Sequence, residues 1–289
     1  MKALLSLALL FSACGFALTA EGENHTLVYK FTAGEEVRTR VLQESTVDTK
    51  IKGVVSIAKS RSVSTKVWKI TAVDSQGNIT LENSVADADM WQSVTGMPEL
   101  KYNSRTDKSP PLGYQYVADS IGKPLATLTI TPAGKLMERK GDQQQHNAGL
   151  GDLAIPLPDG PVKEGDTWEI PEDIRLKIDD VNLSIKVRQF YRLVLVRTGV
   201  ATISLETQVL TPVRDPKILS QLVQRMQKGT IKFDIDAGRL LHRQMDLNES
   251  ILGFSGPESH MNYLSRTTEE PVENVPAAKT AEAGKTAMK

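Results

Sequence analysis

Residues 185–210, IKVRQFYRLVLVRTGVATISLETQVL, contain two runs in which apolar and polar side chains alternate. The first run extends from Ile185 to Val196 and the second from Val200 to Leu210, with Thr198-Gly199 between them. A period of two on both sides of a short glycine turn predicts a pair of long antiparallel strands. Because the polar positions are so regular, we expect one face of the sheet to contact water.

The same pattern occurs in the first part of the chain. Alternating runs start at Leu27 and at Val37, and two more lie on either side of the turn at 74–78. The alternation between Val63 and Ala72 changes parity near Lys66, which predicts a bulge or a bend. Most of the chain is therefore predicted to be antiparallel β.

Only two segments have helical patterns. Asp215-Pro216 is a helix-start signal, with a capping side chain followed by proline at the first helical position. An apolar stripe follows and ends at Lys228-Gly229. Residues 111–121, closed by Gly122, form a shorter candidate helix.

Several segments of the second half repeat the first half in the same order. Trp68-Lys69-Ile70 corresponds to Tyr191-Arg192-Leu193, and the hairpin tip at 133–139 (AGKLMER) corresponds to 237–243 (AGRLLHR). Any β meander yields some such pairs, but their shared order favours duplication. The predicted fold is mainly β: a long-stranded, twisted antiparallel sheet or half-barrel, built from two similar halves, with short helices covering one face.

The sequence divides into five segments. A signal peptide is predicted at 1–20, a first β half at 21–140, a joint rich in Pro and Gly at 141–164, and a second β half at 165–266. Residues 267–289 lack an apolar period and are expected to form a disordered tail.

The first twenty residues predict export. Lys2, an apolar stretch and small residues precede the polar run from Glu21, which is typical of a secretory signal peptide. No segment is apolar enough for a transmembrane helix. Cleavage after Ala20 predicts a periplasmic or secreted protein. The alternative is a lipobox around Cys14, which would make Cys14 an acylated anchor and the protein a membrane-bound lipoprotein.

One short segment resembles a known group of proteins. Leu157 to Trp168 (LPDGPVKEGDTW) is similar to a Pro-Val-Lys-x-Gly-Asp-Thr-Trp segment of an uncharacterised family of exported bacterial proteins, a domain of unknown function. The resemblance implies export and a β fold, and it transfers no catalytic residue. A looser likeness, in architecture alone, is to the bacterial lipoprotein-carrier fold, a curved sheet closed by helices around a lipid cavity.

Composition excludes several classes of protein. Lys and Arg number 35 and Asp and Glu number 35, so the chain has no basic excess for nucleic acid. Cys14 is the only cysteine, so no internal disulfide and no cysteine nucleophile is expected downstream of it. The four histidines lack metal-site spacing, and no phosphate loop or nucleophile motif lies in its required context. We therefore predict no cofactor, no metal site and no catalytic residue.

The leading hypothesis is an exported, non-enzymatic protein that binds an apolar or amphipathic ligand, such as a lipid or a lipoprotein. Its short helices would cover the sheet incompletely. The predicted ligand-lining residues are Trp68, Ile70, Trp91, Tyr191, Leu193, Leu219, Leu222 and Met226. Each of them is also an ordinary core residue. The alternatives are an envelope structural or interaction protein without a small ligand, and a hydrolase with unidentified carboxylates.

Overall fold

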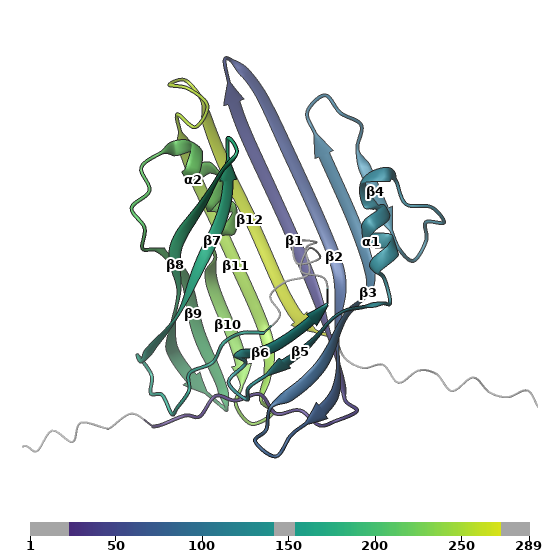
Figure 1. Cartoon of the computed structure of the whole chain (residues 1–289), viewed down its shortest axis with the longest axis vertical. Coiled ribbons are helices and arrows are strands. Elements are labelled where there is room, and N and C mark those ends of the chain that lie inside the picture. The colour runs from purple at the N-terminus through teal and green to yellow at the C-terminus, as the bar shows by residue number, and fades with distance from the viewer. Residues whose placement is uncertain (1–22, 142–153, 273–289) are drawn as a thin grey trace, which may run out of the picture.

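The computed structural model describes residues 23–141 and 154–272. In these residues the chain forms one twelve-stranded antiparallel sheet with two short α-helices (Figure 1). The strands of the first half are β1 (Glu36–Ile51), β2 (Val54–Val73), β3 (Ile79–Val94), β4 (Leu100–Asn103), β5 (Pro124–Ile130) and β6 (Leu136–Gly141). Those of the second half are β7 (Thr167–Ile178), β8 (Val181–Arg197), β9 (Val200–Val209), β10 (Lys228–Asp234), β11 (Arg239–Leu252) and β12 (His260–Pro271).

The sheet is open and strongly curved. Its strand order is β6-β5-β3-β2-β1-β12-β11-β10-β9-β8-β7, and β4 pairs with β3 outside this path. The edge strands β6 and β7 are not paired with each other, and the sheet curves strongly between them (Figure 1). The prediction of a mainly β, long-stranded antiparallel sheet is confirmed.

The two halves share one topology. The orders β1-β2-β3-β5-β6 and β7-β8-β9-β10-β11 are the same, and β12 lies between β1 and β11. In the first half, Gly34 N donates to Ile70 O and Ile70 N to Glu35 O. In the second half, Gly165 N donates to Leu193 O and Leu193 N to Asp166 O. The strand register also shifts directly after Ile70 and directly after Leu193. The two similar halves predicted from the sequence are therefore present in the backbone.

Two irregular segments close the lower end of the molecule, and we call them the base segments: residues 23–35 and 154–166. Tyr29 N donates to Pro132 O and Leu157 N to Ala133 O, so both segments contact the β5–β6 hairpin. Lys30 N donates to Gly238 O, at the tip of the β10–β11 hairpin. The main hydrophobic core lies here, between the base segments and the lower strands. Burial of these apolar side chains is the main stabilising contribution to the fold.

The upper part of the same sheet face is covered on one side by a helix. We call this face the inner face; it carries Trp68 and Tyr191. Helix α2 (Pro216–Leu222) and the 3-10 turn Val223–Arg225 pack on the inner face of β7, β8, β11 and β12. On the side of the sheet that β3 and β4 form, α1 (Gln115–Ser120) lies against β3. No described helix is long and apolar enough to cross a membrane.

The structure departs from the sequence-based boundaries at two places, the end of α2 and the extent of β12, and confirms one expected bulge. Asp215 caps α2 as predicted, accepting from Lys217 N, but the helical turns end at Arg225, and Lys228-Gly229 begins β10. The β2–β3 register shifts between Thr65 and Lys66, where a bulge was expected. Strand β12 continues to Pro271, so residues 267–271 of the expected tail pair with β1 and β11. The signal peptide, Cys14, residues 142–153 of the joint and residues 273–289 lie outside the described residues.

Candidate functional site

The structure divides the predicted ligand-lining residues into three groups. Trp68, Ile70, Tyr191 and Leu193 belong to the core at the lower end. Leu219, Leu222 and Met226 lie at the upper end, where Leu222 is fully buried and the other two are partly buried. Trp91 pairs with Arg61 and Lys101 on the opposite face of β3. The eight residues therefore do not form one surface, and a ligand-lining role for any of them stays a prediction.

Between these groups, the middle of the inner face is lined by small hydroxyl side chains. We call them the hydroxyl strip: Ser45, Ser60, Ser62, Ser64, Ser265 and Thr267. Strand pairing puts them on one face, because Ser45 is opposite both Ser60 and Ser265. Ser45 Oγ and Ser60 Oγ are 2.8 Å apart and share a hydrogen bond. The described helices make their main contacts elsewhere, α2 with β7 and β11 and α1 with β3.

Apolar residues flank the hydroxyl strip on both sides. On the β11–β12 side, Val47 and Tyr263 pack against a buried cluster of Val223, Leu247, Ile251 and Met261. On the β3 side, Met90 is opposite Tyr102. The ring of Tyr102 stacks on that of Tyr114, with centroids 6.2 Å apart. The inner face is thus apolar at two margins and polar along its middle.

A buried charge network lies directly below the hydroxyl strip. Glu269 Oε2 accepts from Lys66 Nζ at 2.7 Å, and Glu269 Oε1 accepts from Arg243 Nη1 at 2.5 Å. The three side chains are 2–7% exposed. Burial by itself would raise the pKa of Glu269, but Lys66 and Arg243 outweigh burial and lower that pKa below the ordinary carboxyl range. The network therefore holds two cations and one anion out of water.

Several buried polar atoms around this network have no hydrogen-bond partner among the described residues: Ser64 Oγ, Trp68 Nε1 and Asn83 Oδ1. Lys66 Nζ lies 5.7 Å from the centre of the Trp68 ring. A small cavity of about 130 Å³ adjoins the network and is lined by Tyr29, Phe31, Lys66, Trp68 and Glu269 among others. Unpaired buried polar atoms are costly, and a bound polar group or ordered water would satisfy them.

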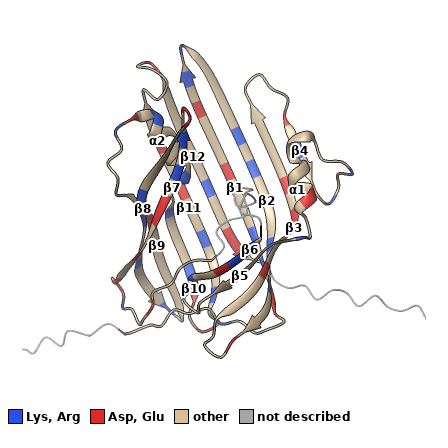
Figure 2. Cartoon of the chain, viewed as in Figure 1, with Lys and Arg blue, Asp and Glu red and all other residues tan. Residues whose placement is uncertain are grey.

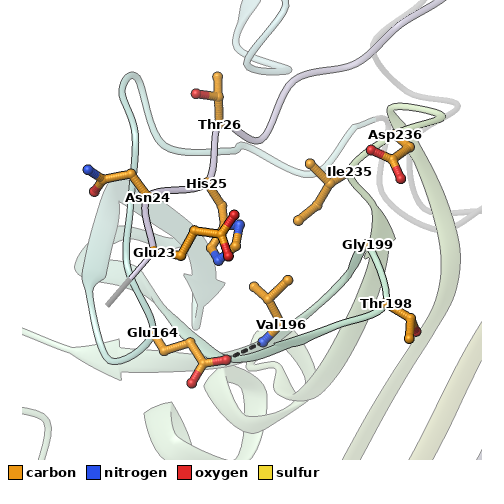
Figure 3. Close-up of a pocket in the computed structure, with 10 residues that line it drawn as sticks. All are labelled: Glu23, Asn24, His25, Thr26, Glu164, Val196, Thr198, Gly199, Ile235 and Asp236. Carbon is orange, nitrogen blue, oxygen red and sulfur yellow. Dashed lines mark hydrogen bonds between the residues drawn. The ribbon is translucent and has the colours of Figure 1, made fainter. Parts of the chain in front are cut away.

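A larger and more polar pocket lies at the lower end. Its volume is about 590 Å³, and it is lined by the base segments and by the β8–β9 and β10–β11 turns (Figure 3). Glu164 Oε1 accepts from Val196 N at 2.7 Å, which fixes that carboxylate at the edge of the pocket. Glu23 and Asp236 add further carboxylates, and His25 adds an imidazole. In the part of the chain that is described, no three potential metal ligands are grouped closely enough to hold an ion.

Sequence reasoning missed the charge network entirely. Lys66 was noted only as the place of a parity change, Arg243 only as part of a repeated hairpin, and Glu269 fell within the expected tail. The available signal was Lys66 itself, which stands at an inward position between Ser64 and Trp68 in an alternating run. A charge at an inward strand position predicts a buried partner of opposite charge.

Comparison with known proteins gives a fold resemblance only. No family model matches the sequence, and no curated protein matches it. A structure from work on lipid–protein interactions in lipovitellin is similar, with a TM-score of 0.52 and 13% identity over 87% of this chain. The match spans only 27% of the lipovitellin chain.

Two further solved structures score much lower. DynF from the dynemicin pathway of Micromonospora chersina has a TM-score of 0.21 and 7% identity, over 87% of this chain and 86% of its own. A DUF1329 family protein from Desulfovibrio piger has a TM-score of 0.16 and 13% identity, over 81% and 84%. TM-scores this low support no conclusion about the fold.

Proposed function

We propose that this chain is an exported, non-enzymatic protein that binds an amphipathic, lipid-like ligand on the inner face of its sheet. The observation that carries the proposal is the arrangement of that face: a hydroxyl strip between two apolar margins, with the main helix contacts elsewhere. Ligand sites commonly combine a mostly apolar lining with a few placed polar groups.

The two kinds of surface suit two parts of one ligand. Hydrocarbon chains would bury apolar area against Val47 and Tyr263 on one side and Met90 on the other. The hydroxyl groups of the strip both donate and accept hydrogen bonds, so they suit ester, hydroxyl or amide groups. A wholly apolar ligand would leave the hydroxyl strip unpaired, which is why an amphipathic ligand fits better than a hydrocarbon.

Lipovitellin supports a lipid as the first ligand to test. Its structure was determined in a study of lipid–protein interactions, and its fold is similar to that of this chain. Because identity is 13%, the similarity concerns the fold, and no lipid-contacting residue transfers.

Four carboxyl groups with a lowered pKa do not suit the role of general acid in a hydrolase. A general acid needs a raised pKa, so that it keeps its proton at neutral pH. Hydrogen bonds from the Asn78 side chain and backbone lower the pKa of Asp74, and those from Lys101 and Trp91 lower that of Glu99. For Asp246, the hydrogen bonds and charge of Arg266 and a hydrogen bond from Gln244 outweigh burial and also lower the pKa. These groups are held in the charged form, as is Glu269.

The test is mass spectrometry of the protein purified from its own envelope, first under native conditions and then after solvent extraction. We expect an amphipathic compound in stoichiometric amount, which would also identify the ligand. A clean polypeptide mass with nothing extracted would contradict the proposal and favour an envelope interaction protein. The intact mass also distinguishes cleavage after Ala20 from acylation at Cys14.

A further inference from the structure

The turns at the upper end of the sheet carry exposed aliphatic side chains. Strand pairing of Lys50 and Leu252 with His260 places the β1–β2 and β11–β12 turns at one end. The β3–β4 and β7–β8 turns lie at that end as well (Figure 1). Each of the four turns has one strongly exposed aliphatic residue at its tip or border: Val54 at 70%, Met97 at 67%, Val181 at 56% and Leu252 at 73%. We call these four the rim residues.

The lower end differs. The turns there are 74–78 (DSQGN), 131–135 (TPAGK), 198–199 (TG) and 235–238 (IDAG), and they consist mostly of polar residues, alanine and glycine. The strongly exposed aliphatic residues nearest this end are Leu136 and Met137, which are next to each other on the edge strand β6. At the upper end all four turns carry a strongly exposed aliphatic residue at the tip or border, whereas at the lower end only one of these four turns does, at Leu136 beside 131–135. A single exposed aliphatic residue is ordinary, but one on each of four turns at the same end suits a common interaction surface.

Lysines accompany the β1–β2 turn. Lys50 and Lys52 are exposed on either side of Ile51, directly before Val54 and the half-exposed Val55. Figure 2 shows this basic tip at the upper end of β1. At the β7–β8 turn, Lys177 pairs with Asp180 at 3.1 Å, so the basic contribution comes from the β1–β2 turn. Lysine stems lie along apolar surface while their ammonium groups reach anionic headgroups, so this combination suits an anionic lipid surface.

We propose that the rim residues dock the open upper end of the sheet onto an anionic lipid bilayer. A protein partner would need one contiguous apolar patch, whereas the rim residues stand on four separate turns. The surface of a bilayer is flat and continuous, so the four turns can insert their rim residues into it at the same time. Docking would bring the uncovered inner face next to the source or the destination of a lipid-like ligand. The inference goes beyond the proposed function, which concerns ligand binding and not a membrane. Vesicle docking and ligand content are measured separately, so either proposal can fail without the other.

The first test uses two variants of the full mature chain, one with a tryptophan at the upper end of the sheet and one with a tryptophan at the lower end. Vesicles of phosphatidylglycerol and phosphatidylethanolamine carry bromine on their acyl chains, which quenches a tryptophan that enters the hydrocarbon. We expect Val54→Trp to add a quenched component above the native tryptophan background and Leu136→Trp to add none. This contrast holds even if an acyl chain on Cys14 brings all variants to the vesicle. Absence of quenching in both variants, or equal quenching in both, would overturn the proposal.

The second test measures affinity by vesicle flotation. The double variant V54S/L252S should bind at least about tenfold more weakly than the unchanged protein, because burial of one aliphatic side chain is worth about a tenfold change in an equilibrium constant. The control L136S/M137S, with similarly exposed side chains at the lower end, should stay within about twofold. K50S/K52S should reduce the preference for anionic over phosphatidylcholine vesicles. Equal losses in rim and control variants, or a rim variant that binds unchanged, would contradict docking by this rim.

Discussion

At the residue scale, the network of Lys66, Glu269 and Arg243 is the most consequential feature of the inner face. It links β2, β12 and β11, so it ties the first half, the linking strand and the second half together. Arg243 Nη2 also donates to Gln227 Oε1 at 2.7 Å, which satisfies a further guanidinium proton. Buried charges of this kind are stable only while each has its partner.

Removal of the single anion should therefore destabilise the fold strongly. We expect Glu269→Gln to lower the free energy of unfolding by about 3–5 kcal/mol, because Lys66 and Arg243 would remain buried without a counter-charge. The measurement is urea unfolding followed by circular dichroism. Glu270→Gln is the matched control: the neighbouring carboxylate is on the other face and 58% exposed, so its loss should cost less than about 0.5 kcal/mol. Equal effects of the two variants would show that the network does not stabilise the protein.

The lowered pKa of Glu269 predicts a specific pH dependence. A carboxyl group with a lower pKa in the folded state than in the unfolded state stabilises the fold fully above its unfolded value. That contribution is lost as pH falls through the folded-state pKa. Between neutral pH and the acid range below about pH 4, the unchanged protein should thus lose more stability than Glu269→Gln does. Parallel stability curves for the two proteins would contradict the lowered pKa.

At the element scale, the base segments hold the two repeated hairpins in place. Tyr29 hydroxyl both donates to Ile155 O and accepts from Ile155 N, which joins one base segment to the other. Gly134, at the β5–β6 tip, fits closely beneath them: a Cβ there would lie 2.5 Å from Ile155 O and 2.7 Å from Tyr29 Cε2. The equivalent Gly238 of the second half would place a Cβ 2.6 Å from Lys30 N.

This packing predicts different costs for two glycine substitutions. Gly134→Ala should destabilise the protein by more than about 2 kcal/mol, because strain at φ 76° adds to a clash with backbone atoms. Gly53→Ala has a similar φ of 82° but nothing within 4 Å, so it should cost about 1 kcal/mol. Thermal unfolding of the two variants measures the difference. If they unfold at the same temperature, the base segments do not pack as tightly as described.

The elements also show how far sequence patterns reach. The long hairpins, the start of α2 at Asp215 and the internal repeat were predictable, because strand periodicity, helix capping and glycine turns are local signals. Strand β12 was only partly recognised, since its last residues, Thr267 to Pro271, are mostly polar and are stabilised by pairing with β1 and β11. Pairing between segments more than two hundred residues apart leaves no local pattern. The same distance hid the ion pair of Lys66 and Glu269.

At the scale of the whole molecule, the two ends of the sheet are built differently. The lower end is closed by the base segments and filled with the main core, so the predicted aromatic residues Trp68 and Tyr191 are buried there. The upper inner face keeps its hydroxyl strip between apolar margins, and the rim residues surround that end. Sequence patterns did not indicate Ser45, Ser60 and Ser62 of the hydroxyl strip, because no motif marks them, and a ligand-lining role of the eight predicted residues stays a prediction.

The most direct test of ligand binding on the inner face uses two adjacent residues of β2. Ser60 is on the inner face and Lys59 on the outer face, and both are exposed. Ser60→Trp would fill the middle of the hydroxyl strip, whereas Lys59→Trp adds the same bulk to the other face. We predict that native mass spectrometry finds the co-purifying amphipathic ligand on the unchanged protein and on Lys59→Trp, and at least about tenfold less of it on Ser60→Trp. Equal ligand content in the two variants would contradict binding on the inner face.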